Sequence, residues 1–83
     1  MVTVQFEERL LTKPISKDIH ITRNGKFIYL YDRAGGSVQD IINTNDLLFV
    51  QPVIALVNEI TTDLSEPLKD GDQVRLLPQI AGG

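Results

Sequence analysis

Two runs of strand-forming residues, 19–23 and 26–31, lie on either side of the dipeptide Asn24-Gly25. This dipeptide accepts the positive φ angles that a two-residue type I′ hairpin turn requires. In the second run, aromatic side chains alternate with aliphatic ones, so that both faces of the strand would carry large apolar groups. We therefore expect an antiparallel hairpin whose second strand is covered on both sides.

A short helix is expected directly after this hairpin. Ser37 can cap its first turn, and Asp40, three residues later, lies near the positive end of the helix dipole. Val38, Ile41 and Ile42 follow the spacing of one helix face, so that a single apolar stripe would face a sheet. The polar residues that come next are poor helix formers and should end the helix.

Four further segments have the pattern of strands. Residues 2–7 alternate apolar and polar side chains, residues 53–57 form a β-branched run suited to a central strand, and residues 60–63 can form a short strand. A last strand at 73–77 follows the turn-forming sequence Asp-Gly-Asp. Hairpin, helix, strand, short strand and last strand is the element order of an α+β protein with its helix across one face of a mixed sheet.

Composition excludes several classes of function. The chain has 83 residues, a formal net charge of −3 and no cysteine. A basic surface for nucleic acid, a thiolate metal site and a cysteine nucleophile are therefore not expected. His20 stands alone and implies no metal site. No apolar run reaches the roughly 20 residues of a membrane span, and no secretory signal precedes the first strand, so we expect a cytoplasmic protein.

The last third of the chain carries a more specific pattern. The sequence Leu68-Lys69-Asp70-Gly71-Asp72-Gln73-Val74, followed by Pro78 and then Ala81-Gly82-Gly83, resembles the C-terminal signature of the ubiquitin-like sulfur carriers of the MoaD/ThiS family. With the element order, the resemblance extends from residue 19 to residue 83, about four fifths of the chain. Two glycines at a natural end arise by chance in only about 0.5% of chains, because glycine makes up about 7% of residues.

The resemblance implies a ubiquitin-like β-grasp fold with a mixed sheet of four to five strands and one main helix, plus an extra N-terminal strand. On this interpretation residues 1–18 are an N-terminal strand or arm, residues 19–78 form the β-grasp domain, and residues 79–83 form a flexible diglycine tail. The division follows from the family pattern, which residues 1–18 do not match.

The resemblance also implies a function in which this chain is a carrier and not an enzyme. The C-terminal carboxylate of Gly83 would be adenylated by an adenylating (E1-like) enzyme and then converted to a thiocarboxylate. Gly82 and Gly83 lack β-carbons that would obstruct a narrow channel toward ATP. ATP would belong to the partner, because this chain has no phosphate-binding loop and is expected to bind no cofactor.

Other partners implied by the resemblance are a sulfur donor and the large subunit of a cofactor synthase, with no nucleic acid or membrane involved. The sulfur would serve cofactor biosynthesis of the molybdopterin or thiamine type. The residues expected to contact partners lie at and beyond the last strand: Arg75, Leu77, Pro78, Ile80 and Ala81.

Two alternatives share these residues. A ubiquitin-like modifier would be conjugated to lysines through the same activated glycine, and a β-grasp interaction module would carry no covalent chemistry. The paired carboxylates Asp70 and Asp72 could in principle serve acid–base chemistry or a metal, but Asp-Gly and Gly-Asp dipeptides favour a turn.

Overall fold

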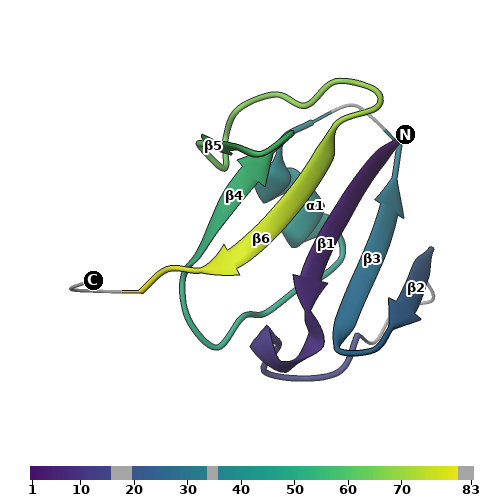
Figure 1. Cartoon of the computed structure of the whole chain (residues 1–83), viewed down its shortest axis with the longest axis vertical. Coiled ribbons are helices and arrows are strands. Elements are labelled where there is room, and N and C mark those ends of the chain that lie inside the picture. Colours follow the sequence, from purple (N-terminus) through teal and green to yellow (C-terminus); the bar gives the residue numbers. More distant parts are fainter. Residues whose placement is uncertain (16–19, 34–35, 81–83) are drawn as a thin grey trace.

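The computed structural model describes residues 1–15, 20–33 and 36–80. Within them, six strands form one sheet in the order β2-β3-β1-β6-β4-β5, and α1 lies across one face (Figure 1). The α+β class is as expected, whereas the sheet has six strands, slightly more than the expected four to five. The strands are β1 (Val2–Glu7), β2 (Ile21–Asn24), β3 (Phe27–Asp32), β4 (Val53–Val57), β5 (Ile60–Thr62) and β6 (Gln73–Pro78), and the helices are a 3₁₀ turn, η1 (Glu8–Leu10), and α1 (Val38–Thr44).

The N-terminal strand β1 lies in the middle of the sheet. It pairs antiparallel with β3 along its whole length and parallel with β6 from Thr3 to Gln5. Its apolar residues Val2, Val4 and Phe6 are at most 1% exposed. The N-terminal strand is therefore a central part of the domain's core and not an addition to it. The edge strand next to β3 is β2, where Ile21 is half-buried and the other three residues are exposed.

The hydrophobic core lies between the sheet and α1. Val38, Ile41 and Ile42, the apolar stripe of the helix, are buried in one cluster with Phe6 of β1 and Leu30 of β3. Side chains alternate along each strand, so the other face of the sheet carries a different set of residues. That second face has no helix over it within the described part of the chain (Figure 1).

The start of α1 confirms the predicted cap. The Ser37 hydroxyl accepts a hydrogen bond from the Asp40 backbone N–H (3.2 Å), and the Asp40 carboxylate accepts one from the Ser37 backbone N–H (3.0 Å). This reciprocal pair satisfies two N–H groups that the first turn of a helix otherwise leaves without partners.

Replacing Ser37 with alanine should lower the free energy of unfolding by about 1 kcal/mol, because the Asp40 N–H loses its acceptor. Urea denaturation of the two proteins measures the difference. If the C-terminus is activated as the resemblance implies, the replacement should leave that activation unchanged, since the cap lies on the helix side of the sheet. A variant with normal stability and impaired activation would contradict this purely structural role.

Two hairpin turns differ in their backbone geometry. Asn58 and Glu59, between β4 and β5, both have positive φ (51° and 70°), as a type I′ turn requires. In the first hairpin the loop residues are Gly25 and Lys26, since Asn24 pairs with Phe27. Only Gly25 has positive φ (63°), which corresponds to a type II′ turn. The turn predicted at Asn24-Gly25 is thus shifted by one residue, because Asn24 still belongs to the strand.

Candidate functional site

The predicted partner-binding residues lie along the end of β6. Arg75 and Leu77 are on the sheet face away from the helix, since the residues that alternate with them, Val74 and Leu76, are 2% and 1% exposed in the core. Pro78 ends the strand. Ala81, Gly82 and Gly83 lie outside the described residues.

The chain beyond β6 is held at its base. The Gln79 N–H donates to the Pro52 carbonyl (2.9 Å), and the Gln51 side-chain amide donates to the Gln79 carbonyl (3.3 Å). Ile80, the last described residue, is 76% exposed, although it is a large apolar side chain. The start of the tail is thus fixed to the segment before β4, and the next residue faces solvent.

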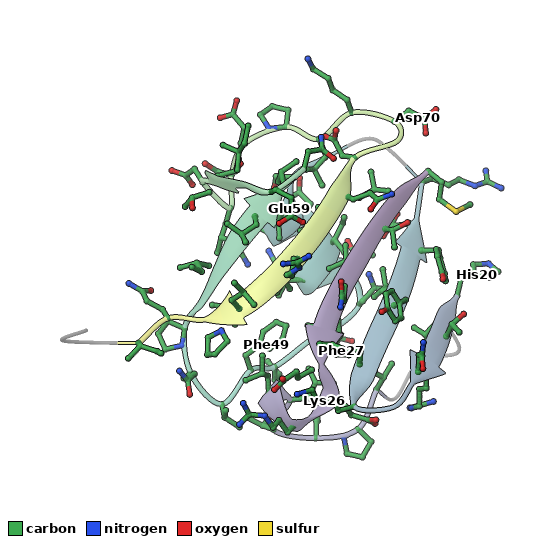
Figure 2. All side chains as sticks on the ribbon, viewed as in Figure 1. His20, Lys26, Phe27, Phe49, Glu59 and Asp70 are labelled. Atoms are coloured by element: carbon green, nitrogen blue, oxygen red, sulfur yellow. The ribbon has the colours of Figure 1, made fainter. Side chains whose placement is uncertain are left out.

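A groove of about 510 Å³ lies beside this base, between the ends of β1 and β6. The two strands pair only as far as Gln5 and Arg75, and beyond that point they diverge (Figure 1). Residues 75–78 line one side of the groove, and the other lining residues are Gln5, Phe6, Glu7, Arg9, Leu10 and Phe27. Phe49 packs edge-on against Phe6, with ring centroids 5.6 Å apart, and Figure 2 shows it in the gap between the diverging strands.

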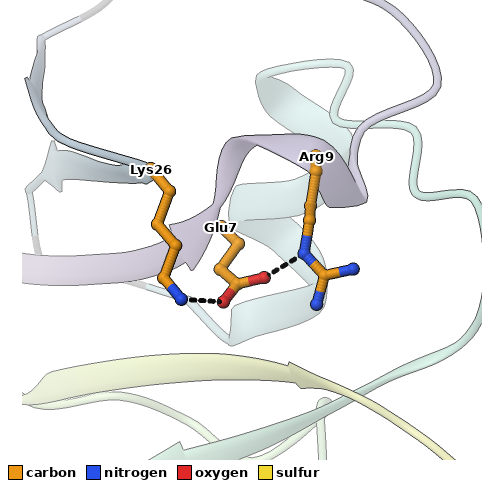
Figure 3. Close-up of polar contacts among 3 residues, drawn as sticks. All are labelled: Glu7, Arg9 and Lys26. Atoms are coloured by element: carbon orange, nitrogen blue, oxygen red, sulfur yellow. Dashed lines mark hydrogen bonds and ion pairs between the residues drawn. The ribbon is translucent and has the colours of Figure 1, made fainter.

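Charged residues surround one end of the groove. The Glu7 carboxylate accepts a hydrogen bond from Arg9 Nε and lies 3.2 Å from Lys26 Nζ (Figure 3). The hydrogen bond from Arg9 and then that from Lys26 hold the pKa of Glu7 below its ordinary value, so the carboxylate is ionised at neutral pH. On the other side of the groove, Arg75 forms an ion pair with Glu59 (2.9 Å).

The two aspartates of the Asp-Gly-Asp sequence have structural partners. The Asp72 carboxylate accepts hydrogen bonds from the Lys69 backbone N–H (2.8 Å) and from the Asn58 amide (3.0 Å). The first of these bonds is the main cause of the lowered pKa of Asp72. Gly71 has a φ of 91°, and Asp70 pairs with the N-terminal ammonium group. The turn interpretation is therefore confirmed, and its hydrogen bonds tie β1, β6 and the β4–β5 hairpin together.

The region from β2 onward matches a known protein family. A model of the ThiS family matches residues 21–83, about three quarters of the chain. The chain belongs to the ThiS family. Searches of curated proteins and of solved structures each gave no match.

Membership of the ThiS family indicates a sulfur-carrier role. ThiS-family proteins are small carrier proteins rather than enzymes, and they interact with E1-like activating enzymes. The resemblance seen in the sequence is thereby confirmed at the level of the family. The matched region starts at β2 and includes α1 and the diglycine end, so β1 and η1 lie outside it.

Clusters of metal ligands and membrane-spanning helices can be assessed over residues 1–15, 20–33 and 36–80. In this part of the ThiS-family chain no three histidine, cysteine or acidic side chains gather as metal ligands would. Among the same residues, no helix has the length and apolar character needed to cross a membrane.

Sequence reasoning missed the residues on the N-terminal side of the groove. Glu7, Arg9 and Lys26 come together only because Glu7 of β1 lies opposite Phe27 of β3, next to Lys26. The alternation of residues 2–7 indicates a strand but does not identify its neighbours. No local signal in the sequence marks this cluster of charges.

Proposed function

We propose that this ThiS-family chain carries sulfur as a thiocarboxylate on Gly83 for cofactor biosynthesis of the molybdopterin or thiamine type. The observation that carries the proposal is the family match, which runs through the diglycine to residue 83. The arrangement around β6 supports it, because Gln79 is anchored to Pro52 and Ile80, the last described residue, is exposed beyond the end of the strand.

The proposed chemistry has two steps. A carboxylate oxygen of Gly83 attacks the α-phosphate of ATP, pyrophosphate leaves, and an acyl-adenylate forms. Hydrosulfide supplied by a sulfur donor then attacks the carbonyl carbon, AMP leaves, and a thiocarboxylate remains. ATP is bound by the activating enzyme, and this chain contributes the acyl group alone and binds no cofactor of its own.

Each partner would use a different part of the site. The activating enzyme takes in Ala81, Gly82 and Gly83 and contacts the end of β6, where Arg75, Leu77 and Pro78 lie, together with Ile80. A sulfur donor supplies the second step. The large subunit of a cofactor synthase would accept the loaded carrier afterwards.

The first step can be tested by ATP–pyrophosphate exchange. The cognate activating enzyme should incorporate radiolabelled pyrophosphate into ATP when the chain is added, because acyl-adenylate formation is reversible. The enzyme without the chain sets the background. Exchange no higher than this background would show that the chain is not a substrate for activation.

A further inference from the structure

The groove between β1 and β6 is lined both by residues inside the region that matches the ThiS family and by residues outside it. Residues 75–78 on one side belong to the matched region and lead directly into the tail. Of the other lining residues, Phe27 also belongs to the match, whereas residues 5–7, 9 and 10 lie outside it. A partner seated in this groove would therefore contact residues for which the family match does not account.

The groove is apolar inside and positively charged at one end. Phe6, Leu10 and Leu76 are at most 3% exposed beneath it, while Phe27 and Leu77 are half-buried along it. Its volume of about 510 Å³ is within the range of roughly 300–1,000 Å³ that is typical of binding pockets. It can accept a large apolar side chain of a partner, the kind of anchor that contributes most to protein interfaces.

The charges at one end of the groove indicate which polar group a partner would carry beside its apolar side chain. Glu7, Arg9 and Lys26 together carry one negative and two positive charges, on a chain whose net charge is −3. The Arg9 side chain is 73% exposed, and Glu7 engages its Nε (Figure 3). Guanidinium groups pair well with carboxylates through their terminal nitrogens. The complementary group on a partner is therefore a carboxylate beside the apolar anchor.

Continuity with the tail identifies which partner this is. Pro78 lines the groove, and Gly83 lies five residues further along the chain. Fully extended, five residues span at most about 18 Å. An enzyme that draws the Gly83 carboxylate to ATP must therefore come within that distance of Pro78, which is itself one of the residues that line the groove.

We propose that the activating enzyme docks in this groove, with an apolar side chain between β1 and β6 and a carboxylate at Arg9. The N-terminal segment thus helps this ThiS-family carrier to select its activating enzyme. The inference rests on the proposed function and adds a contact, Arg9, that the family match does not contain. Exposed charges at the border of an interface mainly affect association and partner selection, so Arg9 should influence KM for the chain and not kcat.

The test is the concentration dependence of pyrophosphate exchange. Arg9→Glu should raise KM for the chain about tenfold, with kcat within a factor of two, because the introduced carboxylate repels that of the enzyme. Arg9→Lys should retain most of the affinity. Arg33→Glu is the matched control: it makes the same charge change on an exposed side chain after β3, at the end of the sheet opposite the groove.

The outcomes separate the two proposals. Thermal melts establish that each variant is folded, which is expected because Arg9 is exposed. If Arg9→Glu raises KM no more than Arg33→Glu does, the docking proposal is wrong while activation stands. If the unchanged chain itself supports no exchange, the proposed function fails instead.

Discussion

Deletion of Gly83 should abolish exchange of pyrophosphate by the activating enzyme, and it should leave the midpoint of thermal unfolding unchanged. The deletion withdraws the terminal carboxylate by one residue, about 3.5 Å, from the α-phosphate of bound ATP. A displacement of about 1 Å already costs on the order of 100-fold in an oriented reaction. The fold should persist, because strand pairing ends at Pro78 and the deleted residue lies beyond it.

Two other changes at the same end give graded expectations. One extra residue after Gly83 should also abolish exchange, since the carboxylate that reacts is then displaced in the other direction. Gly82→Ala keeps the carboxylate in place and adds a single methyl group, so it should reduce exchange by a smaller factor. Full exchange activity in the deletion variant would refute both the carrier and the modifier interpretation.

Phe6→Ala should destabilise the protein by about 3–5 kcal/mol, measured by urea denaturation. Phe6 is 1% exposed in the middle strand of the sheet and packs edge-on against Phe49. Truncation removes both the buried ring and that contact and leaves a cavity between the sheet and the helix.

Thr3→Ala is the control for Phe6→Ala. Thr3 lies on the same strand but points to the face without the helix, where it is half-buried. Its replacement should cost less than about 1 kcal/mol. Similar small losses for both variants would show that β1 contributes little to the core and would contradict its central place in the sheet.

Local features of the fold could be predicted from local sequence. Ser37 and Asp40 predicted the capped helix, because a capping box involves residues three positions apart. The positive φ of Asn58 in the turn after β4 likewise agrees with a local preference, since asparagine tolerates positive φ. The sequence does not determine the register of the first turn, because both Asn24-Gly25 and Gly25-Lys26 place a glycine in the loop.

The order of the strands could not be predicted in the same way. Alternation in residues 2–7 shows which side chains share a face, but not which strands lie on either side. β1 and β2 both precede β3, and either could in principle occupy the centre of the sheet. Burial decides between them, since every second residue of β1 is buried and β2 has none that is.

The candidate site also contains some residues marked by local sequence and others brought together only by the tertiary structure. Gly82 and Gly83 are assigned from a family signature; they lie outside the described residues, and their role stays a prediction. Arg9 and its partners could not be predicted, because the cluster depends on the pairing of β1 with β3. A contact that joins residues 7 and 26 is set by the tertiary structure and has no signature in the chain.

The most direct measurement of the central claim is the intact mass of the chain after incubation with ATP, the activating enzyme and a sulfur donor. Replacement of one terminal oxygen by sulfur should raise the mass by about 16 Da, and fragmentation should place the increase on Gly83. Isopeptide-linked adducts in place of this increase would identify a protein modifier. An unchanged mass, with enzyme and donor shown to be active on another carrier, would contradict the assignment as a sulfur carrier.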